Sequence, residues 1–338
     1  MNRKPNLAIV GATGMVGTTF LKVLEERNFP YEKVYLLAAP DEDGAILTFD
    51  GRDYRVEGIS DQSFDGKDID IALFSAGGGP SAHFAPIAAA RGILVVDNSS
   101  QWRMDPDVPL VVPEVNPQAA FTAFGKKMII ANPNCSTIQA MVALKPLQDT
   151  YGLKRIVYST YQAVSGSGVR GTHELSEGLK GNDLCVAYPH PIANNCLPHI
   201  DVFEENGYTK EEMKMINETH KILDDDSIAV TATTVRLPVF YSHSESINVE
   251  MKTPFDVEDV RRLFADAPGI ILKDDPASDV YPLARDAAGT DEVYVGRIRR
   301  DFSVENGLNI WCVADNIRKG AATNTVQIAQ LVLDRVTA

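Results

Sequence analysis

The chain has 338 residues, 44% of them hydrophobic, and a formal net charge of −14. This length allows about two domains with sizeable cores. The chain lacks a basic tract, which argues against a nucleic-acid or anionic-membrane partner, since both bind clustered Lys and Arg. The four cysteines show neither a CxxC pair nor Cys/His ligand spacing. We therefore expect no metal site and no disulfide framework, and a reducing cytoplasm fits best.

Neither a secretory signal peptide nor a membrane-spanning segment is expected, because the apolar run near the N-terminus is short and no longer run follows. The first predicted elements are a buried strand over residues 7–10, a glycine-rich turn over 11–17 and a helix over 15–27. Such glycines let a pyrophosphate approach the helix N-terminus. The turn therefore predicts dinucleotide binding in which Thr13 also contacts phosphate, although an incidental turn is the alternative.

A second strand is predicted over residues 33–37, and the loop after it contains Asp41 and Glu42. In a dinucleotide-binding fold an acidic side chain here accepts a hydrogen bond from a free ribose 2′-hydroxyl, whereas a 2′-phosphate needs Arg or Ser. Taken alone, the loop favours NAD. A solvated surface turn is the alternative interpretation.

Further parallel strands are predicted over residues 69–74 and 92–96, with a helix over 82–91 between them. The loops over 75–81 and 97–103 follow strand ends, where open α/β sheets bind ligands. Arg103 lies in the second loop beside two serines. It is either an anion contact or an ordinary surface charge.

Cys135 lies in a turn between a strand over residues 126–131 and a helix over 137–150. The unpaired N–H groups and the dipole at a helix N-terminus favour a thiolate, so Cys135 is a candidate nucleophile. A buried structural cysteine is the alternative.

The second half of the chain is rich in strands. These are predicted over residues 155–162, 228–239, 246–251, 292–299 and 308–314, with helices over 171–180, 210–223 and 257–265. This pattern predicts an α/β chain with an N-terminal Rossmann-type domain of residues 1–131 and a second, α+β domain of residues 132–315 with a mixed, largely antiparallel sheet. A final amphipathic helix within 316–338 is expected to rejoin the first domain.

Four features of this half suggest chemistry. A glycine-serine loop begins at Gln162, at the end of a strand. Glu211 and Lys214 share a helix face and are either a surface ion pair or functional groups. Arg236 lies in an apolar strand and requires an anionic partner there. His243, next to a turn, is the best candidate for a general acid or base.

Nine segments occur in order along almost the whole chain and together resemble bacterial aspartate-β-semialdehyde dehydrogenases: GATGMVG, DNSSQWR, NPNCST, QAVSGSG, YPHPIANNCLPHIDVF, EEMKM, VRLPVFYSHSE, VGRIRRD and VADNIRKGAATN. The resemblance implies a Rossmann domain followed by a catalytic and dimerisation domain, and a homodimer. It implies NADP-dependent, reversible reductive dephosphorylation of L-aspartyl 4-phosphate to L-aspartate 4-semialdehyde. That step leads towards lysine, diaminopimelate, threonine, methionine and isoleucine.

The resemblance also assigns roles to matching residues. Cys135 matches the nucleophile that forms a thioester, His243 the acid/base and Gln162 the residue that orients the acyl group. Arg236 resembles the ligand of the substrate carboxylate and Glu211 that of the ammonium, while Arg103, Asn134 and Lys214 resemble the phosphate site. The expected cofactor-binding residues are Gly11, Thr13, Gly14, Met15, Val16, Gly17, Asp41, Glu42, Ser165, Gly166 and Asn316.

One departure concerns the cofactor. Many bacterial members of the family carry a Ser/Arg-containing loop after the second strand, but this chain has Asp41 and Glu42 there. Their repulsion of a 2′-phosphate predicts NADP with a relaxed preference, or a change to NAD, unless the carboxylates point away.

Two rival functions remain open at this point. Reduction of N-acetyl-γ-glutamyl phosphate uses the same thioester chemistry, but an acylated amine needs no acidic partner, so Glu211 favours aspartyl phosphate. A paralogue that only binds nucleotide or assembles with other proteins would be expected to lack Cys135 or His243, and this chain has both.

Overall fold

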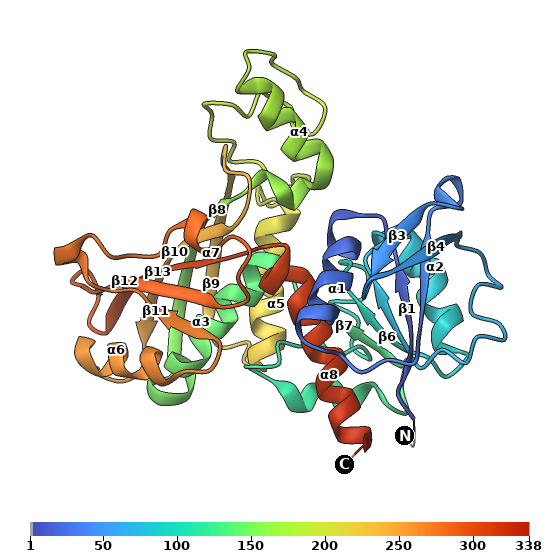
Figure 1. Cartoon of the computed structure of the whole chain (residues 1–338). Coiled ribbons are helices and arrows are strands. Elements are labelled where there is room, and N and C mark those ends of the chain that lie inside the picture. Colours follow the sequence, from blue (N-terminus) through green and yellow to red (C-terminus); the bar gives the residue numbers. More distant parts are fainter. Residues whose placement is uncertain (1–2, 338) are drawn as a thin grey trace. The chain divides into compact units, whose positions relative to one another are not determined.

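The structure, a computed structural model, describes residues 3–337. It contains two compact units, Met1–Pro133 with Ala321–Ala338, and Asn134–Gly320 (Figure 1). From the sequence we expect the chain to pass from the first domain to the second at residue 132 and to return to the first at residue 316. Residues 1, 2 and 338 of those domains lie outside the described residues. No helix in the described part of the chain has the length and apolar character needed to cross a membrane.

The first unit contains a seven-stranded sheet with the order β3-β4-β2-β1-β5-β6-β7. The strands are β1 (Asn6–Val10), β2 (Lys33–Ala38), β3 (Ile46–Phe49), β4 (Arg52–Gly58), β5 (Ile71–Phe74), β6 (Leu94–Asp97) and β7 (Ile129–Ala131). All neighbours are parallel except β3 and β4, which form an antiparallel hairpin at the edge. The predicted Rossmann-type fold is confirmed. The hairpin was not expected, because β3 has only four residues and β4 carries several charges on a largely exposed strand.

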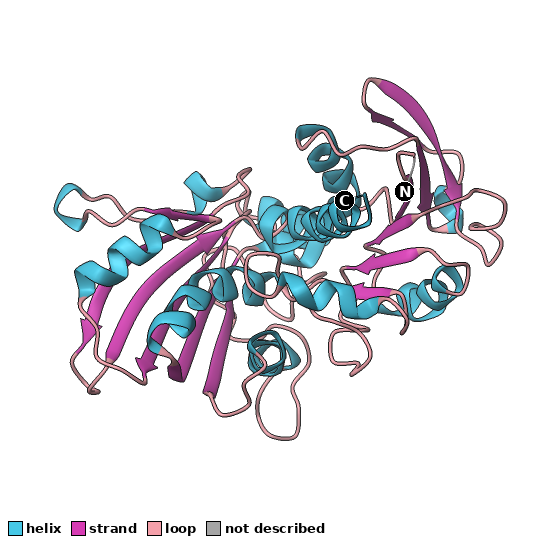
Figure 2. Ribbon diagram, turned by 90° about the horizontal axis from the view of Figure 1, so that it is seen from below, coloured by secondary structure: helices cyan, strands magenta, loops and turns pink. Residues whose placement is uncertain are grey.

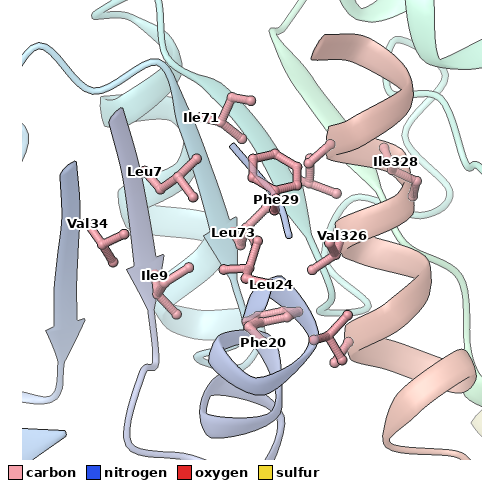
Figure 3. Packing of buried hydrophobic residues seen from close by; sticks show 14 of the residues in the cluster. Leu7, Ile9, Phe20, Leu24, Phe29, Val34, Ile71, Leu73, Val326 and Ile328 are labelled. Atoms are coloured by element: carbon pink, nitrogen blue, oxygen red, sulfur yellow. The ribbon is translucent and has the colours of Figure 1, made fainter. Parts of the chain in front are cut away.

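Among its described residues, this unit has the helices α1 (Met15–Glu26), α2 (Gly78–Ala89) and α8 (Thr323–Thr337), with short 3₁₀ turns η1 (Pro40–Glu42) and η2 (Pro117–Ala123). Figure 3 shows the core, in which side chains of α1 and α8 meet those of the central strands. The contributing residues include Phe20 and Leu24 of α1, Leu7 and Ile9 of β1, Leu73 of β5 and Val326 of α8. The apolar side of α8 therefore completes this core.

The second unit contains a six-stranded sheet with the order β11-β12-β13-β10-β8-β9. Its strands are β8 (Leu153–Gln162), β9 (Ala229–Arg236), β10 (His243–Met251), β11 (Ile270–Leu272), β12 (Val293–Asp301) and β13 (Gly307–Ala314). The β8–β10, β10–β13 and β13–β12 pairs are antiparallel, and the two outer pairs, β8–β9 and β11–β12, are parallel. The prediction of a mixed, largely antiparallel sheet is confirmed.

Helices α3 (Cys135–Tyr151), α5 (Lys210–Leu223) and α6 (Val257–Asp266) pack on this sheet (Figure 2). Alternate side chains of β8, such as Tyr158 and Gln162, are buried, while Ser159 and Tyr161 between them are only half-buried. Helix α4 (Gly168–Gly178) follows a 3₁₀ turn, η3 (Val164–Ser167), beyond the end of β8 (Figure 1). The remaining elements are α7 (Ala284–Ala287), a 3₁₀ turn η4 (Pro276–Ser278) and a π-helical turn η5 (Arg318–Ala322).

Candidate active site

Cys135 is the first residue of α3 and is partly buried. Asn134 is the N-cap of this helix, and its Oδ1 accepts from the backbone N–H groups of Ser136 (2.9 Å) and Thr137 (3.3 Å). A Cβ added at Gly320 would lie 2.9 Å from the Cβ of Cys135, so only a glycine fits there. The nucleophile candidate is therefore held in the first turn of a capped helix, against a close-packed backbone.

Two carboxylates of α5 accept hydrogen bonds that Asn134 donates. Glu218 Oε2 accepts the backbone N–H of Asn134 at 2.6 Å, and Glu211 Oε1 accepts its side-chain N–H at 2.9 Å. The sequence analysis did not single out Glu218. The signal that could have found it is its spacing of seven residues from Glu211, which places both side chains on one face of a helix.

Glu211 is buried and joins several of the predicted site residues. It also accepts from Gln162 Nε2 at 3.3 Å and from Lys214 Nζ at 3.1 Å, and Lys214 reaches Asp201 at 2.8 Å. Burial alone would raise the pKa of Glu211, but Lys214, Asn134 and Arg236 outweigh it and hold the pKa below its ordinary value. The site thus keeps a buried negative charge.

A second group of predicted residues meets at the loop after β8. The N–H of Ala163 donates to His243 Nδ1 at 2.9 Å, and Arg236 Nη1 donates to the carbonyl oxygen of Ala163 at 2.7 Å. A Cβ added at Gly166 would lie 2.7 Å from Arg236 Nη1 and 3.4 Å from His243 Nε2. The glycine therefore leaves a space that both side chains border.

Arg236 and His243 each keep one buried nitrogen without a hydrogen bond partner in the described structure, Nε and Nε2 respectively. Buried donors of this kind are costly unless a ligand pairs with them. The ring of Tyr188 lies 5.9 Å from the guanidinium of Arg236, and its hydroxyl donates to the carbonyl oxygen of Val164 at 3.4 Å. Tyr188 also escaped the sequence analysis as an individual residue, although it lies in a segment that carried the family resemblance.

Ser165 and Asn316, two expected cofactor contacts, bond to each other, with Asn316 Nδ2 donating to Ser165 Oγ at 3.0 Å. Asn316 Oδ1 also accepts the N–H of Ser242 at 3.0 Å, directly before His243. Both residues are buried. The loop after β8, the end of β13 and the start of β10 are thereby tied together.

The glycine-rich turn in the first unit is closely packed at two of its three glycines. Gly11 has φ +85°, and an added Cβ would lie 2.4 Å from the carbonyl oxygen of Ser75. A Cβ at Gly17 would lie 2.0 Å from the carbonyl oxygen of Gly11, whereas Gly14 is exposed and a Cβ there would meet only that oxygen, at 3.4 Å. Gly11 and Gly17 close the turn, and Gly14 leaves the N-terminus of α1 open to a ligand. Thr13, Met15 and Val16 are only partly buried at this point.

The acidic loop after β2 is largely engaged with its own surroundings. Glu42 Oε2 accepts the N–H of Ala39 at 3.3 Å, so this side chain turns back on η1. Asp43 accepts the N–H of Gly58 at 3.0 Å and pairs with Arg55 at 2.9 Å, and these contacts lower the pKa of Asp43. Asp41 is exposed. The repulsion of a 2′-phosphate that the sequence suggests is weakened accordingly.

Arg103 also belongs to the first unit and is buried there. Its Nε donates to the carbonyl oxygen of Asn132 at 3.0 Å and its Nη2 to that of Asn98 at 3.1 Å. Within residues 3–337, no three His, Cys, Asp or Glu side chains gather in a way that could hold a metal ion. The four cysteines, all within the described residues, form no disulfide there.

Comparisons with known proteins agree with this geometry. The family model "Semialdehyde dehydrogenase, NAD binding domain" matches residues 6–123, and "Semialdehyde dehydrogenase, dimerisation domain" matches residues 144–319. The aspartate-semialdehyde dehydrogenase of Aquifex aeolicus is 57% identical over 334 residues, 97% of each chain.

Two solved structures are also similar. Aspartate semialdehyde dehydrogenase II of Vibrio cholerae, complexed with ASA, is 49% identical, with a TM-score of 0.94 over 98% of this chain and 99% of that one. The enzyme of Candida albicans with NADP is 26% identical, with a TM-score of 0.77 over 97% and 98%. The chain therefore belongs to the aspartate-semialdehyde dehydrogenases, a family of aldehyde oxidoreductases with a nicotinamide-nucleotide-binding domain.

Proposed function

We propose that the protein catalyses the NADP-dependent, reversible reductive dephosphorylation of L-aspartyl 4-phosphate to L-aspartate 4-semialdehyde through a thioester on Cys135. The observation that carries this proposal is the capped turn at Cys135, whose Asn134 is bonded to Glu211, which in turn accepts from Gln162. A nucleophile, an acidic group for an ammonium and an amide for an acyl oxygen are thus neighbours.

The substrate has three charged groups, and the chain offers a partner for each. Glu211 stays ionised when buried, and it is the proposed ligand of the α-ammonium. Arg236 has a buried Nε without a partner among the described residues, and it is the proposed ligand of the α-carboxylate. Arg103, Asn134 and Lys214 are the proposed phosphate ligands. Lys214 is already paired with Asp201 and Glu211, so phosphate would have to share it.

The proposed chemistry begins when the Cys135 thiolate, favoured at the N-terminus of α3, adds to the acyl carbon and displaces phosphate. Gln162 orients the acyl group, and His243, whose Nε2 borders the space at Gly166, is the proposed acid/base group. The nicotinamide cofactor supplies the hydride when it is bound.

The residues of the first unit fit such a cofactor. The turn Gly11–Gly17, with Thr13, Met15 and Val16, would hold the pyrophosphate, and Ser165, Gly166 and Asn316 of the second unit are the proposed contacts of its other half. NADP is supported by the relative from Candida albicans. Since Asp41 is exposed in the loop after β2, where the sequence predicts the ribose contacts, we propose NADP with a relaxed preference, or NAD.

We also propose that the protein is a homodimer that uses the open face of the six-stranded sheet. The match to a dimerisation domain supports this assembly. A cavity on the second unit is lined by half-buried Tyr161 and Trp311 together with Arg297 and Arg299. The proposed setting is the cytoplasm, in the biosynthesis of lysine, diaminopimelate, threonine, methionine and isoleucine.

A coupled assay with aspartate semialdehyde, phosphate and either NADP or NAD tests the activity. Mass spectrometry of enzyme quenched with aspartyl phosphate should show an acyl adduct on Cys135. In Cys135→Ala we expect the adduct to vanish and turnover to fall by about 10⁴-fold or more, with cofactor binding retained. Turnover that survives in this variant would remove the covalent mechanism.

The rival substrate, N-acetyl-γ-glutamyl phosphate, is tested in the same assay with its own semialdehyde. Because the pKa of Glu211 is held low by its neighbours, the site favours a free ammonium over an acetylated amine. We expect no turnover of the acetylated compound. Efficient turnover of that compound would change the assigned substrate while leaving the thioester chemistry in place.

A further inference from the structure

The guanidinium of Arg236, at the end of β9, lies against an aromatic ring. The ring centre of Tyr188 is 5.9 Å from it, within the roughly 6 Å over which a cation is attracted to an aromatic face. Both side chains are buried, with exposed fractions of 5% for Arg236 and 8% for Tyr188. Because such a contact is stronger where water is excluded, the ring contributes to the direction in which the guanidinium points.

The groups that hold this guanidinium are neutral. Its Nη1 donates to the carbonyl oxygen of Ala163 at 2.7 Å, and its buried Nε has no hydrogen bond partner among the described residues. Burial raises the pKa of Tyr188, and the charge of Arg236 only partly offsets this effect, so the phenol stays neutral. The ring therefore orients the cation without neutralising it, as a carboxylate in the same place would do.

The position of Tyr188 is fixed by a small apolar cluster beyond the end of β8. Its hydroxyl donates to the carbonyl oxygen of Val164 at 3.4 Å, which is long for a hydrogen bond of this kind. The ring itself packs with buried apolar side chains of the cluster, namely Val164, Leu175, Ile192 and Leu197. An apolar side chain of similar size at position 188 would therefore keep this cluster filled.

A buried carboxylate of α4 fixes the backbone directly before Tyr188. Oε2 of Glu174 accepts the N–H groups of Val186 at 2.8 Å and of Ala187 at 2.7 Å. The other oxygen of Glu174, Oε1, is buried without a hydrogen bond partner in the described structure. Two hydrogen bonds to one oxygen thus attach consecutive residues of this segment to α4.

The same segment also pairs with the backbone of Arg236. The N–H of Leu197 donates to the carbonyl oxygen of Arg236 at 2.9 Å, and the N–H of Arg236 donates back at 2.8 Å. The segment from Val186 to Leu197 therefore contacts Arg236 at two levels, through the backbone at Leu197 and through the ring of Tyr188.

We infer that Tyr188 is a positioning residue that increases the affinity for the substrate α-carboxylate through Arg236, and that Glu174 holds Tyr188 in place for this role. This inference rests on the proposed function, in which Arg236 binds that carboxylate. A guanidinium binds a carboxylate best through two parallel N–H groups, so a change in its direction weakens the contact. Since the proposed reaction at Cys135 does not use Tyr188, the effect is on substrate binding.

Steady-state kinetics with aspartate semialdehyde and phosphate test this role. In Tyr188→Leu, which keeps the cluster filled, we expect KM for aspartate semialdehyde to rise about 5- to 30-fold, the range for a buried cation–π contact. KM for phosphate and kcat should stay close to those of the unchanged protein. Tyr188→Phe keeps the ring and should retain the low KM. A normal KM for aspartate semialdehyde in Tyr188→Leu, or a loss in kcat alone, would overturn the inference.

A double variant separates an action through Arg236 from a general loss of structure. Arg236→Gln removes the guanidinium and should itself raise KM for aspartate semialdehyde. Adding Tyr188→Leu to it should then lower kcat/KM little further, because the ring has no cation left to orient. If the two losses multiply instead, the ring acts elsewhere and the inference fails.

Two substitutions at Glu174 test the attachment to α4. Glu174→Gln keeps an oxygen for both N–H groups and should retain the low KM for aspartate semialdehyde, whereas Glu174→Ala should raise it as Tyr188→Leu does. Glu177→Ala, on the same helix, is the matched control and should be normal. Equal KM values for the two Glu174 variants would overturn the role given to this carboxylate.

Failure of the proposed function would give a different result. An unchanged protein that does not turn over aspartate semialdehyde would remove the proposed function, and the inference with it. A normal KM in Arg236→Gln would remove the proposed carboxylate site. Failure of the inference alone requires normal turnover, a raised KM in Arg236→Gln and a normal KM in Tyr188→Leu.

Discussion

Two strand-to-helix junctions, the glycine turn before α1 and the junction before α3, are built from different groups. The first is made of backbone, with Gly11 and Gly17 packed where no Cβ fits. The second is made of side chains, since Asn134 is bonded to residues 77 and 84 positions away, Glu211 and Glu218. A backbone site is specified locally by glycine, whereas a side-chain site depends on partners that the fold must deliver.

This difference predicts that a substitution at the first junction lowers both the stability of the fold and the affinity for the cofactor. In Gly17→Ala the added Cβ meets a backbone oxygen at 2.0 Å, so we expect a loss of about 3 kcal/mol or more in stability and severe loss of cofactor binding. Gly14→Ala is the matched control. Its Cβ has room at 3.4 Å, so it should weaken cofactor binding with little change in the urea midpoint. Equal midpoints for the two variants would contradict this division of roles.

For substitutions at the second junction we expect weaker substrate binding and unchanged cofactor binding. Glu211→Gln removes the charge proposed to bind the ammonium and should raise KM for aspartate semialdehyde by about 10–100-fold, the range for a hydrogen bond to a charged group. Cofactor affinity, measured by titration calorimetry, should not change. The exposed Glu205→Gln is the control for lost negative charge. A KM that stays constant in Glu211→Gln would remove this residue from the substrate site.

The same contrast explains which features of the fold and of the site could be predicted from the sequence. Helix α5 begins and ends where predicted, and its start is marked by a capping box of Thr209 and Glu212 that is visible in the sequence. The glycine turn was equally readable, since its glycines, strand and helix are contiguous. The bond from Asn134 to Glu218 and the bond from Ala163 to His243 were not, because each joins segments about 80 residues apart. The β3–β4 hairpin was missed because β3 has only four residues and β4 is a charged, largely exposed strand without an apolar run.

A smaller effect, on cofactor preference, is expected from a side-chain ion pair in the first unit. Arg55 offsets the charge of Asp43 in the loop after β2. Arg55→Gln should leave that carboxylate uncompensated and lower the preference for NADPH over NADH by a few-fold, as expected for an exposed charge. The ratio of kcat/KM values for the two cofactors measures this, with Arg52→Gln as the control on the same strand. If the ratio does not move, Asp43 lies too far from the 2′ position to matter.

The smallest expected effect is the dependence of stability on the protonation of His243. Because burial and Arg236 hold its pKa well below the ordinary value, the folded protein keeps the ring neutral while the unfolded chain takes up a proton below about pH 6.5. The unfolded state then binds more protons. This contribution to stability is therefore complete above about pH 6.5 and is lost as the pH falls, by at most about 1.4 kcal/mol per pH unit.

Urea unfolding at about pH 7.5 and about pH 5.5, on either side of the ordinary histidine pKa, measures this loss. Other titrating groups contribute equally to the unchanged protein and to a variant, so the difference between their slopes isolates His243. His243→Gln should lose less stability on acidification than the unchanged protein, while the exposed His173→Gln should follow it. Parallel loss in all three would mean that the folded protein accommodates a charged ring, and the side-chain site would then be less rigid than its hydrogen bonds imply.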